Sequence, residues 1–181
     1  MSTVAHFSLA EYNRIVESGA LDRRRLELIR GEIREMAAIG PLHEDVVDVL
    51  TRWSMESVGK RARVRVQHSV GLPELESAPE PDVAWVTRRS YAQGRPQTPD
   101  VFLIIEVSES SLEYDRGDKA AMYAEAGIKD YWVVNLRDRA IEVHREPSER
   151  GYRSVSVSRG QDEVRPLAFP EVVLRPSMLW E

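Results

Sequence analysis

The sequence of 181 residues contains no cysteine. Disulfide bonds, thiol nucleophiles and thiolate metal ligands are therefore excluded, and the composition fits a reducing compartment. Residues 1–7 lack the basic and apolar regions of a secretory leader, and no apolar run approaches the roughly 18 residues of a membrane span. These absences favour a cytoplasmic protein.

A surplus of basic charge is also missing, because 30 acidic residues outnumber 25 basic ones and the formal net charge is −5. Domains that hold nucleic acid by bulk electrostatics are usually basic, so that class is disfavoured. A metal-dependent nuclease is still compatible, since bound cations offset phosphate charge in such sites. We expect ordinary solvated surface at the three basic clusters, which are Arg23-Arg24-Arg25, residues 60–65 and Arg88-Arg89.

The length and the 42% hydrophobic content suit one domain with one core, spanning residues 1–181. The clearest local signal is the capping box formed by Ser8 and Glu11. Spacing of apolar residues indicates the other elements. The expected order is a helix at 9–18, a hairpin at 25–36 turning at Gly31, a helix at 41–58, strands at 63–70, 82–86 and 101–107, a helix from about residue 115, and a meander of strands at 131–136, 140–145 and 152–158.

Lys119 stands where the helix that follows the central strand should carry a core residue. At about 100° per residue, Met122 and Tyr123 fall within roughly 60° of Lys119 on the apolar face. The ammonium group should therefore face the strand on which the helix packs, and this is the strand that ends near Glu106. A buried lysine needs a paired anion, and such pairs gather at sites of chemistry.

Two carboxylates are expected at strand ends, where Asp82 follows Pro81 and Glu106 shares a face with Phe102 and Ile104. If the strands are neighbours, the two carboxylates can converge on one hard divalent cation. Each residue also has an ordinary explanation. Asp82 suits a turn, Glu106 suits a strand end that reaches solvent, and Lys119 suits a snorkelling side chain or a structural ion pair.

Pro81-Asp82, then Glu106-Val107-Ser108, then Lys119 resemble the PD-(D/E)xK nuclease pattern with its lysine displaced. Within that superfamily the chain resembles the Uma-type family of putative restriction endonucleases over about residues 8–180. The resemblance implies a restriction-endonuclease-like α/β fold, in which helices flank a mixed sheet and an N-terminal helix and hairpin are added. The matching stretches are residues 26–32, His43, residues 79–84, 105–108 and 115–127, Tyr131-Trp132 and residues 174–180.

The resemblance implies hydrolysis of DNA phosphodiester bonds with Mg²⁺ or Mn²⁺, commonly by a homodimer. Asp82 and Glu106 would hold the metal. Lys119 would supply the positive charge that Ser108, at the usual lysine position, cannot. Glu27 resembles a supplementary acidic ligand, although a solvated strand glutamate is an equal alternative.

The sequence also suggests residues that could support the site. His43 faces inward at the start of its helix, where a hydrogen-bonded core histidine is favoured over a role at the edge of the site. Gln67 and Ser108 could line the site, whereas Tyr131 and Trp132 suit the core or an interface. Replacing Lys119 by methionine should remove a buried charge, keep or increase stability, and abolish cleavage.

Two other functions stay open. The first is a binding module that keeps the nuclease fold without cutting, which the acidic composition and the missing lysine at position 108 favour. The second is a metal-dependent hydrolase of small phosphoesters.

Overall fold

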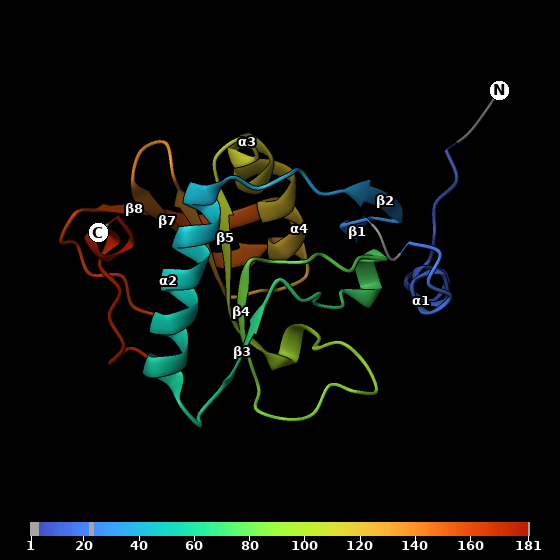
Figure 1. The fold of residues 1–181 in the computed structure, drawn as a ribbon, viewed down its shortest axis with the longest axis horizontal. Helices are drawn as coiled ribbons and strands as arrows, with labels where there is room; N and C mark the ends of the chain where they lie inside the picture. The colour runs from blue at the N-terminus through green and yellow to red at the C-terminus, as the bar shows by residue number, and fades with distance from the viewer. Residues whose placement is uncertain (1–3, 22–23, 181) are drawn as a thin grey trace.

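A computed structural model describes residues 4–21 and 24–180, so Arg23 of the first basic cluster lies outside it. Helices cover both faces of a six-stranded sheet with the order β3-β4-β5-β6-β7-β8 (Figure 1). Neighbouring strands are antiparallel, except that β5 and β6 run parallel. The predicted mixed α/β fold is confirmed. The strands are β3 (Arg63–Val66), β4 (Val83–Val86), β5 (Val101–Ser108), β6 (Asp130–Asn135), β7 (Ala140–Ser148) and β8 (Gly151–Arg159).

Helix α2 (Pro41–Val58) covers one face of this sheet. A proline at its first position and Gly59 directly after its last residue delimit it, as the sequence predicts. Its apolar stripe, which includes Val46 and Leu50, is buried in the same core cluster as Trp85 of β4. The helix therefore fixes its N-terminal turn beside the end of the sheet at which β4 begins.

A continuous helical segment covers the opposite face: α3 (Leu112–Tyr114), a π-helical turn (Asp115–Lys119) and α4 (Ala120–Glu125). The expected start near residue 115 is thus wrong, because the helix begins three residues earlier. A π-helical turn is wider than an α-helical one, so the 100° periodicity applies only from its end onward. There, Met122 and Tyr123 are buried in one cluster with Ile104 of β5, as the apolar face predicts.

Strands β4 and β5 are antiparallel neighbours in which Val83 pairs with Ile105. The same register places Asp82, which precedes β4, opposite Glu106. A register shift at the other end of this pair alters the alternation of β5, so Phe102 packs on the α2 side. The expectation that Glu106 shares a face with Phe102 is therefore wrong, whereas it does share one with Ile104.

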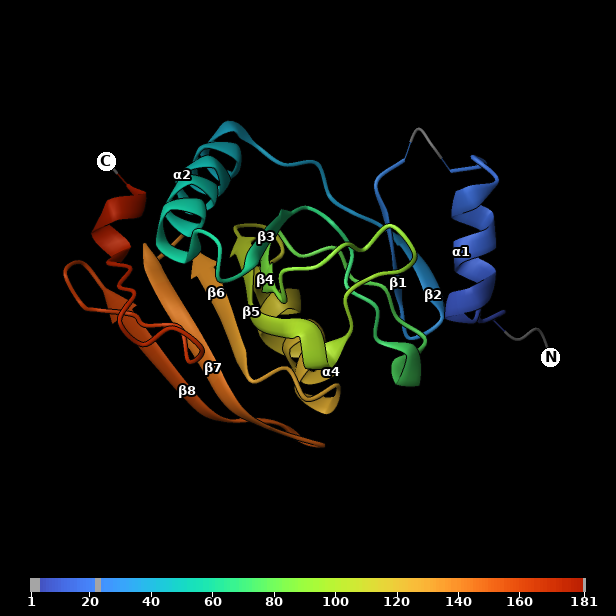
Figure 2. The same cartoon turned by 90° about the horizontal axis from the view of Figure 1, so that it is seen from below.

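Helix α1 (Leu9–Glu17) and the hairpin of β1 (Leu26–Ile29) and β2 (Glu32–Glu35) lie to one side of the main sheet (Figure 2). The predicted capping box is formed at the start of α1. Tyr12 and Leu28 share a small core with Ala78, and the Ala78 N–H donates to the Leu28 carbonyl at 2.8 Å. This contact attaches the hairpin to the loop that leads into β4.

Some predicted boundaries are wrong. Strand β3 ends at Val66 rather than at residue 70, because Gln67 adopts a left-handed φ of 50°. The β7–β8 turn is shorter than expected, since pairing extends to Ser148 and Gly151. In the described part of the chain, no helix is both long and apolar enough to cross a membrane. Short 3-10 helices occupy Pro73–Leu75, Thr98–Asp100 and Pro176–Leu179.

The β1–β2 turn yields a prediction about stability, because φ is 51° at Arg30 and 80° at Gly31. A Cβ at Gly31 would lie 3.0 Å from the His6 Cβ and 3.2 Å from the Phe7 carbonyl oxygen. We expect Gly31→Ala to lower the free energy of unfolding in urea by roughly 1–3 kcal/mol. At Gly94 an added Cβ meets nothing within 4 Å, so Gly94→Ala should change the free energy of unfolding by less than about 0.5 kcal/mol. Equal losses of stability in Gly31→Ala and Gly94→Ala would contradict a requirement for glycine in this turn.

Candidate active site

A cavity of about 310 Å³ opens between the β1–β2 hairpin, the start of α2 and the helical segment. Segments 36–40 and 109–111 contribute to its rim. Five of the predicted site residues line it together: Glu27, His43, Asp82, Glu106 and Lys119. The cavity is thus the place where the sequence-predicted residues meet.

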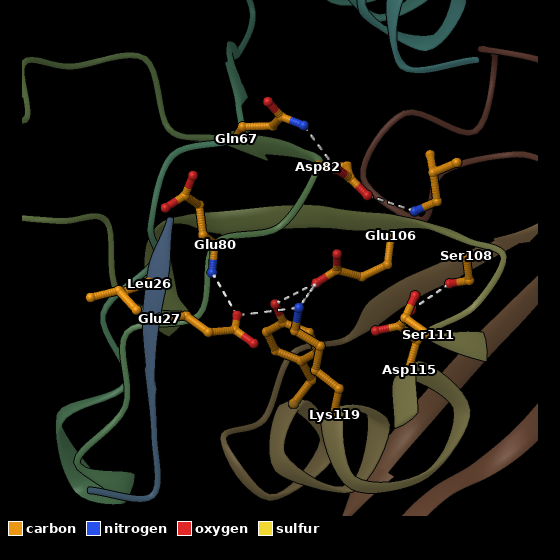
Figure 3. Close-up of polar contacts among 12 residues, drawn as sticks. Leu26, Glu27, Gln67, Glu80, Asp82, Glu106, Ser108, Ser111, Asp115 and Lys119 are labelled. Atoms are coloured by element: carbon orange, nitrogen blue, oxygen red, sulfur yellow. Dashed lines mark hydrogen bonds and ion pairs between the residues drawn. The ribbon is translucent and has the colours of Figure 1, made fainter. Parts of the chain in front are cut away.

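The ammonium group of Lys119 lies between two buried carboxylates (Figure 3). Its Nζ is 2.9 Å from Glu106 Oε1 and 3.3 Å from Glu27 Oε2. Burial alone would lower the pKa of Lys119, but the surrounding carboxylates, Glu106 foremost, outweigh it and raise the pKa above its usual range. The side chain is 5% exposed, so it is a buried cation and not a snorkelling group.

Glu106 projects from β5 toward α4, where its Oε1 also accepts the Tyr123 hydroxyl at 3.1 Å. Burial raises the pKa of Glu106 well above its ordinary value, and Lys119 opposes that shift. Neighbouring carboxylates, including Asp115, raise this pKa further. A strand end that reaches solvent is therefore excluded, and the charge of Glu106 depends on a nearby cation.

Asp82 is oriented by three contacts on its two oxygens. Its Oδ2 accepts the Val107 N–H at 2.9 Å and lies 3.2 Å from His43 Nε2. The Gln67 side-chain amide donates to Oδ1 at 3.2 Å. Burial would raise the pKa of Asp82, but these partners, His43 foremost, outweigh it and lower the pKa. Asp82 is therefore ionised at neutral pH. Its buried, hydrogen-bonded environment differs from that of an ordinary turn residue.

The structure decides between the alternative environments that the sequence allows for Glu27, His43 and Ser108. Glu27 is 5% exposed, and its Oε2 accepts the Glu80 N–H at 3.3 Å, so the solvated alternative is wrong. His43 is buried and contacts Asp82. It therefore combines the environment of a hydrogen-bonded core histidine with a position at the edge of the site. Ser108 lies behind the cavity wall and donates to Asp115 Oδ2 at 2.6 Å.

Asp115 and Tyr123 belong to the site although the sequence analysis gave them no role there. Asp115 also accepts the Ser111 hydroxyl at 2.6 Å, and burial raises its pKa against the opposing effects of Lys119 and the two serines. A spacing signal existed for both. Ser111, at the N-cap of the helical segment, lies four residues before Asp115, and Lys119 lies four residues before Tyr123; this spacing places side chains together.

The acidic groups around the cavity exceed the basic ones that neutralise them, and this excess suits a bound cation. Within the described ranges, no three acidic or imidazole groups already surround one ion position. Mg²⁺ needs fewer protein ligands, since it usually takes one or two carboxylates and completes its shell with water and phosphate. The hard oxygens of Asp82, directly before β4, and of Glu106, on the neighbouring β5, therefore fit such an ion.

Comparisons with known proteins agree with this architecture. The model of the family described as "Uma2: Putative restriction endonuclease" matches residues 9–177. A crystal structure of a putative nuclease belonging to DUF820, from Anabaena variabilis ATCC 29413, is similar with a TM-score of 0.73 and 16% sequence identity. The match covers 96% of this chain and 97% of that one, and it shows a shared fold. No curated protein matches the sequence.

The buried ion pairs reverse the expectation that Lys119→Met keeps or increases stability. Methionine would leave Glu106 and Glu27 buried without their cation, which should cost about 3–5 kcal/mol of unfolding free energy at pH 8. The pKa of Glu106 is raised in the folded protein, so its ionisation lowers the stability of the protein as the pH rises above 4.5, the pKa of glutamate in the unfolded chain. The stability lost in the variant should therefore be smaller near pH 5. Urea titrations at both pH values measure this.

Lys129→Met is the matched control, because Lys129 is exposed and its replacement should change stability by no more than about 0.5 kcal/mol. A loss at Lys119 that is small or independent of pH would contradict the described pairing.

The contact between His43 and Asp82 predicts how the pKa of His43 responds to the loss of the Asp82 charge. Burial would lower the pKa of His43, but Asp82 outweighs it, so the pKa lies above its ordinary 6.5. The charged imidazole therefore contributes stability below about pH 6.5, and this is lost as the pH rises through the folded pKa. In Asp82→Asn the burial persists without the charge, so an NMR titration in metal-free buffer should find the pKa of His43 below 6.5.

His144 on β7 provides the internal control for this titration, since burial lowers its pKa independently of Asp82. Its pKa should be the same in both proteins. A His43 pKa that does not fall in the variant would show that Asp82 does not stabilise the imidazolium.

Proposed function

Because the chain belongs to the Uma2 family of putative restriction endonucleases, we propose that it is a metal-dependent endonuclease that hydrolyses DNA phosphodiester bonds. One observation carries the proposal. Asp82, directly before β4, and Glu106, on the neighbouring strand β5, share a cavity with a lysine whose Nζ is 2.9 Å from Glu106. Two carboxylates that can hold a metal, with a cation beside them, are groups that a metal-dependent phosphodiesterase can use.

The proposed cofactor is Mg²⁺ or Mn²⁺, held by Asp82 and Glu106, with Glu27 as a secondary ligand. Bound there, the ion would polarise the scissile phosphate and make a coordinated water more acidic. The support for this choice is the excess of buried carboxylate oxygen over the cations that neutralise it.

Lys119 has the proposed role of orienting the attacking water or stabilising charge that develops on the phosphoryl group. Its ammonium reaches the carboxylates from the helical segment and so takes the place of a lysine at position 108. Tyr123 holds the Glu106 carboxylate at 3.1 Å, while the Val107 N–H holds Asp82 at 2.9 Å. These contacts orient both carboxylates before any substrate arrives, which is how such sites limit reorganisation during reaction.

We also propose that the protein acts as a homodimer. The two strands of a DNA duplex are antiparallel, and two sites related by a twofold axis match that symmetry. The dimer is therefore the form expected to cut both strands.

Cleavage of supercoiled plasmid with Mg²⁺ tests the endonuclease. Glu106→Gln keeps the shape of the side chain but removes its charge, so we expect a loss of activity on the order of 100-fold or more. Glu149→Gln makes the same change at an exposed turn position and should retain full activity. An active Glu106→Gln protein would refute the assignment of Glu106.

Titration calorimetry with Mn²⁺ distinguishes the endonuclease from a binding module of the same fold. The wild type should bind the ion, and Asp82→Asn should not, because it lacks the second carboxylate. Absence of metal binding by the wild type would contradict the proposal. Hydrolysis of free nucleotides but of no DNA or RNA would instead indicate a small-phosphoester hydrolase.

A further inference from the structure

The hairpin wall of the cavity carries two arginines, Arg25 and Arg34, and neither forms an ion pair with a buried carboxylate among the described residues. Glu27 pairs with Arg34 across the strands, so their side chains share a face. Arg25 lies two residues before Glu27 and therefore joins that face, and the strand pairing continues to it because the Met36 N–H donates to its carbonyl at 2.9 Å. Both arginines line the cavity and flank Glu27.

Arg25 carries a buried donor. Its Nη2 is shielded from solvent and has no hydrogen-bond partner among the described residues. Arg24, the preceding residue, differs because it is exposed and pairs with Glu35 at 2.6 Å. The expected solvated surface is therefore right for Arg24 and wrong for Arg25. Buried polar groups are nearly always paired, so this donor, on a guanidinium that belongs to the cavity wall, indicates hydrogen bonding that a ligand could complete.

Arg34 is held differently but faces the same space. Its guanidinium lies over the ring of Tyr114, 5.4 Å from the centroid, and one nitrogen is 3.1 Å from a Glu32 oxygen. This cation–π contact and the single pairing with Glu32 leave other N–H groups of the guanidinium able to donate elsewhere. The side chain is 40% exposed, so it lies nearer the mouth of the cavity than Arg25.

The charges of the cavity indicate which ligand these donors fit. The carboxylates around Lys119 would repel a polyanionic strand, so a substrate phosphate needs cations elsewhere on the wall. Guanidinium groups bind phosphate oxygens through two parallel N–H donors, a geometry that an ammonium cannot provide. Arg25 and Arg34 bring two such cations to the hairpin wall, whereas Asp82 and Glu106 come from the main sheet and the segment that leads into it.

We propose that Arg25 and Arg34 form a phosphate-binding subsite for the nucleic-acid strand, holding backbone phosphates that flank the cleaved bond. Arg25 is the inner contact and Arg34 the outer one. The inference rests on the proposed endonuclease function and adds the residues that bind its substrate.

Fluorescence anisotropy with a labelled DNA duplex tests the subsite, with Ca²⁺ replacing Mg²⁺ to separate binding from cleavage. Arg25→Met and Arg34→Met should each weaken binding by about tenfold and reduce the slope of log K against log salt by about 1. Arg25→Lys and Arg34→Lys should keep the slope but not the full affinity, because an ammonium retains the charge and loses the paired donors.

Arg150→Met is the control, because Arg150 is exposed in the β7–β8 turn at the opposite end of the sheet from the cavity. Its affinity and salt slope should equal those of the wild type. Thermal melting of every variant checks the fold, and the lysine variants decide the result if a methionine variant does not fold.

The outcomes separate this subsite from the proposed activity. If the wild type cuts DNA and the methionine variants bind and cut it equally well, the phosphate-binding subsite alone is overturned. Weakened binding by these variants, together with a wild type that binds but does not cut, would keep the subsite and overturn the endonuclease. A wild type that binds no DNA would overturn both.

Discussion

The ion pairs of Lys119 connect the three parts of the molecule that form the cavity. Lys119 comes from the helical segment, Glu106 from the central strand and Glu27 from the N-terminal hairpin, and one ammonium group contacts both carboxylates. A buried charge without a partner is costly, so the position of each part depends on the other two. The hairpin is therefore attached to the sheet by electrostatics as well as by its small apolar core, and it brings Arg25 and Arg34 with it.

The two central carboxylates differ in what maintains their charge. Main-chain and side-chain donors lower the pKa of Asp82, whereas burial raises that of Glu106. Asp82 is thus an anion fixed by its hydrogen bonds, and Glu106 is an anion only while a cation is near. Environments that separate the pKa values of paired acids are typical of sites of chemistry. In the proposed reaction, Lys119 maintains the charge of Glu106 until metal and substrate arrive.

Local signals predicted much of this arrangement, and tertiary contacts explain the remainder. The capping box of α1, the limits of α2 and the inward face of Lys119 follow from short-range patterns. The π-helical turn and the register shift that reorients Phe102 are backbone irregularities, and side-chain spacing does not encode them. The burial of Glu27 and of the Arg25 Nη2 depends on where the hairpin docks. The predicted effect of Lys119→Met on stability changes for the same reason, because the partners of the lysine come from distant elements.

A crystal structure of the protein with Mn²⁺, with the ion located by anomalous scattering, tests the central claim most directly. The account predicts one ion in the cavity, with carboxylate oxygens of Asp82 and Glu106 both within about 2.0–2.6 Å of it. Lys119 should remain beside Glu106. An empty cavity at saturating Mn²⁺, or an ion bound elsewhere while the Lys119 ion pairs persist unchanged, would contradict the account.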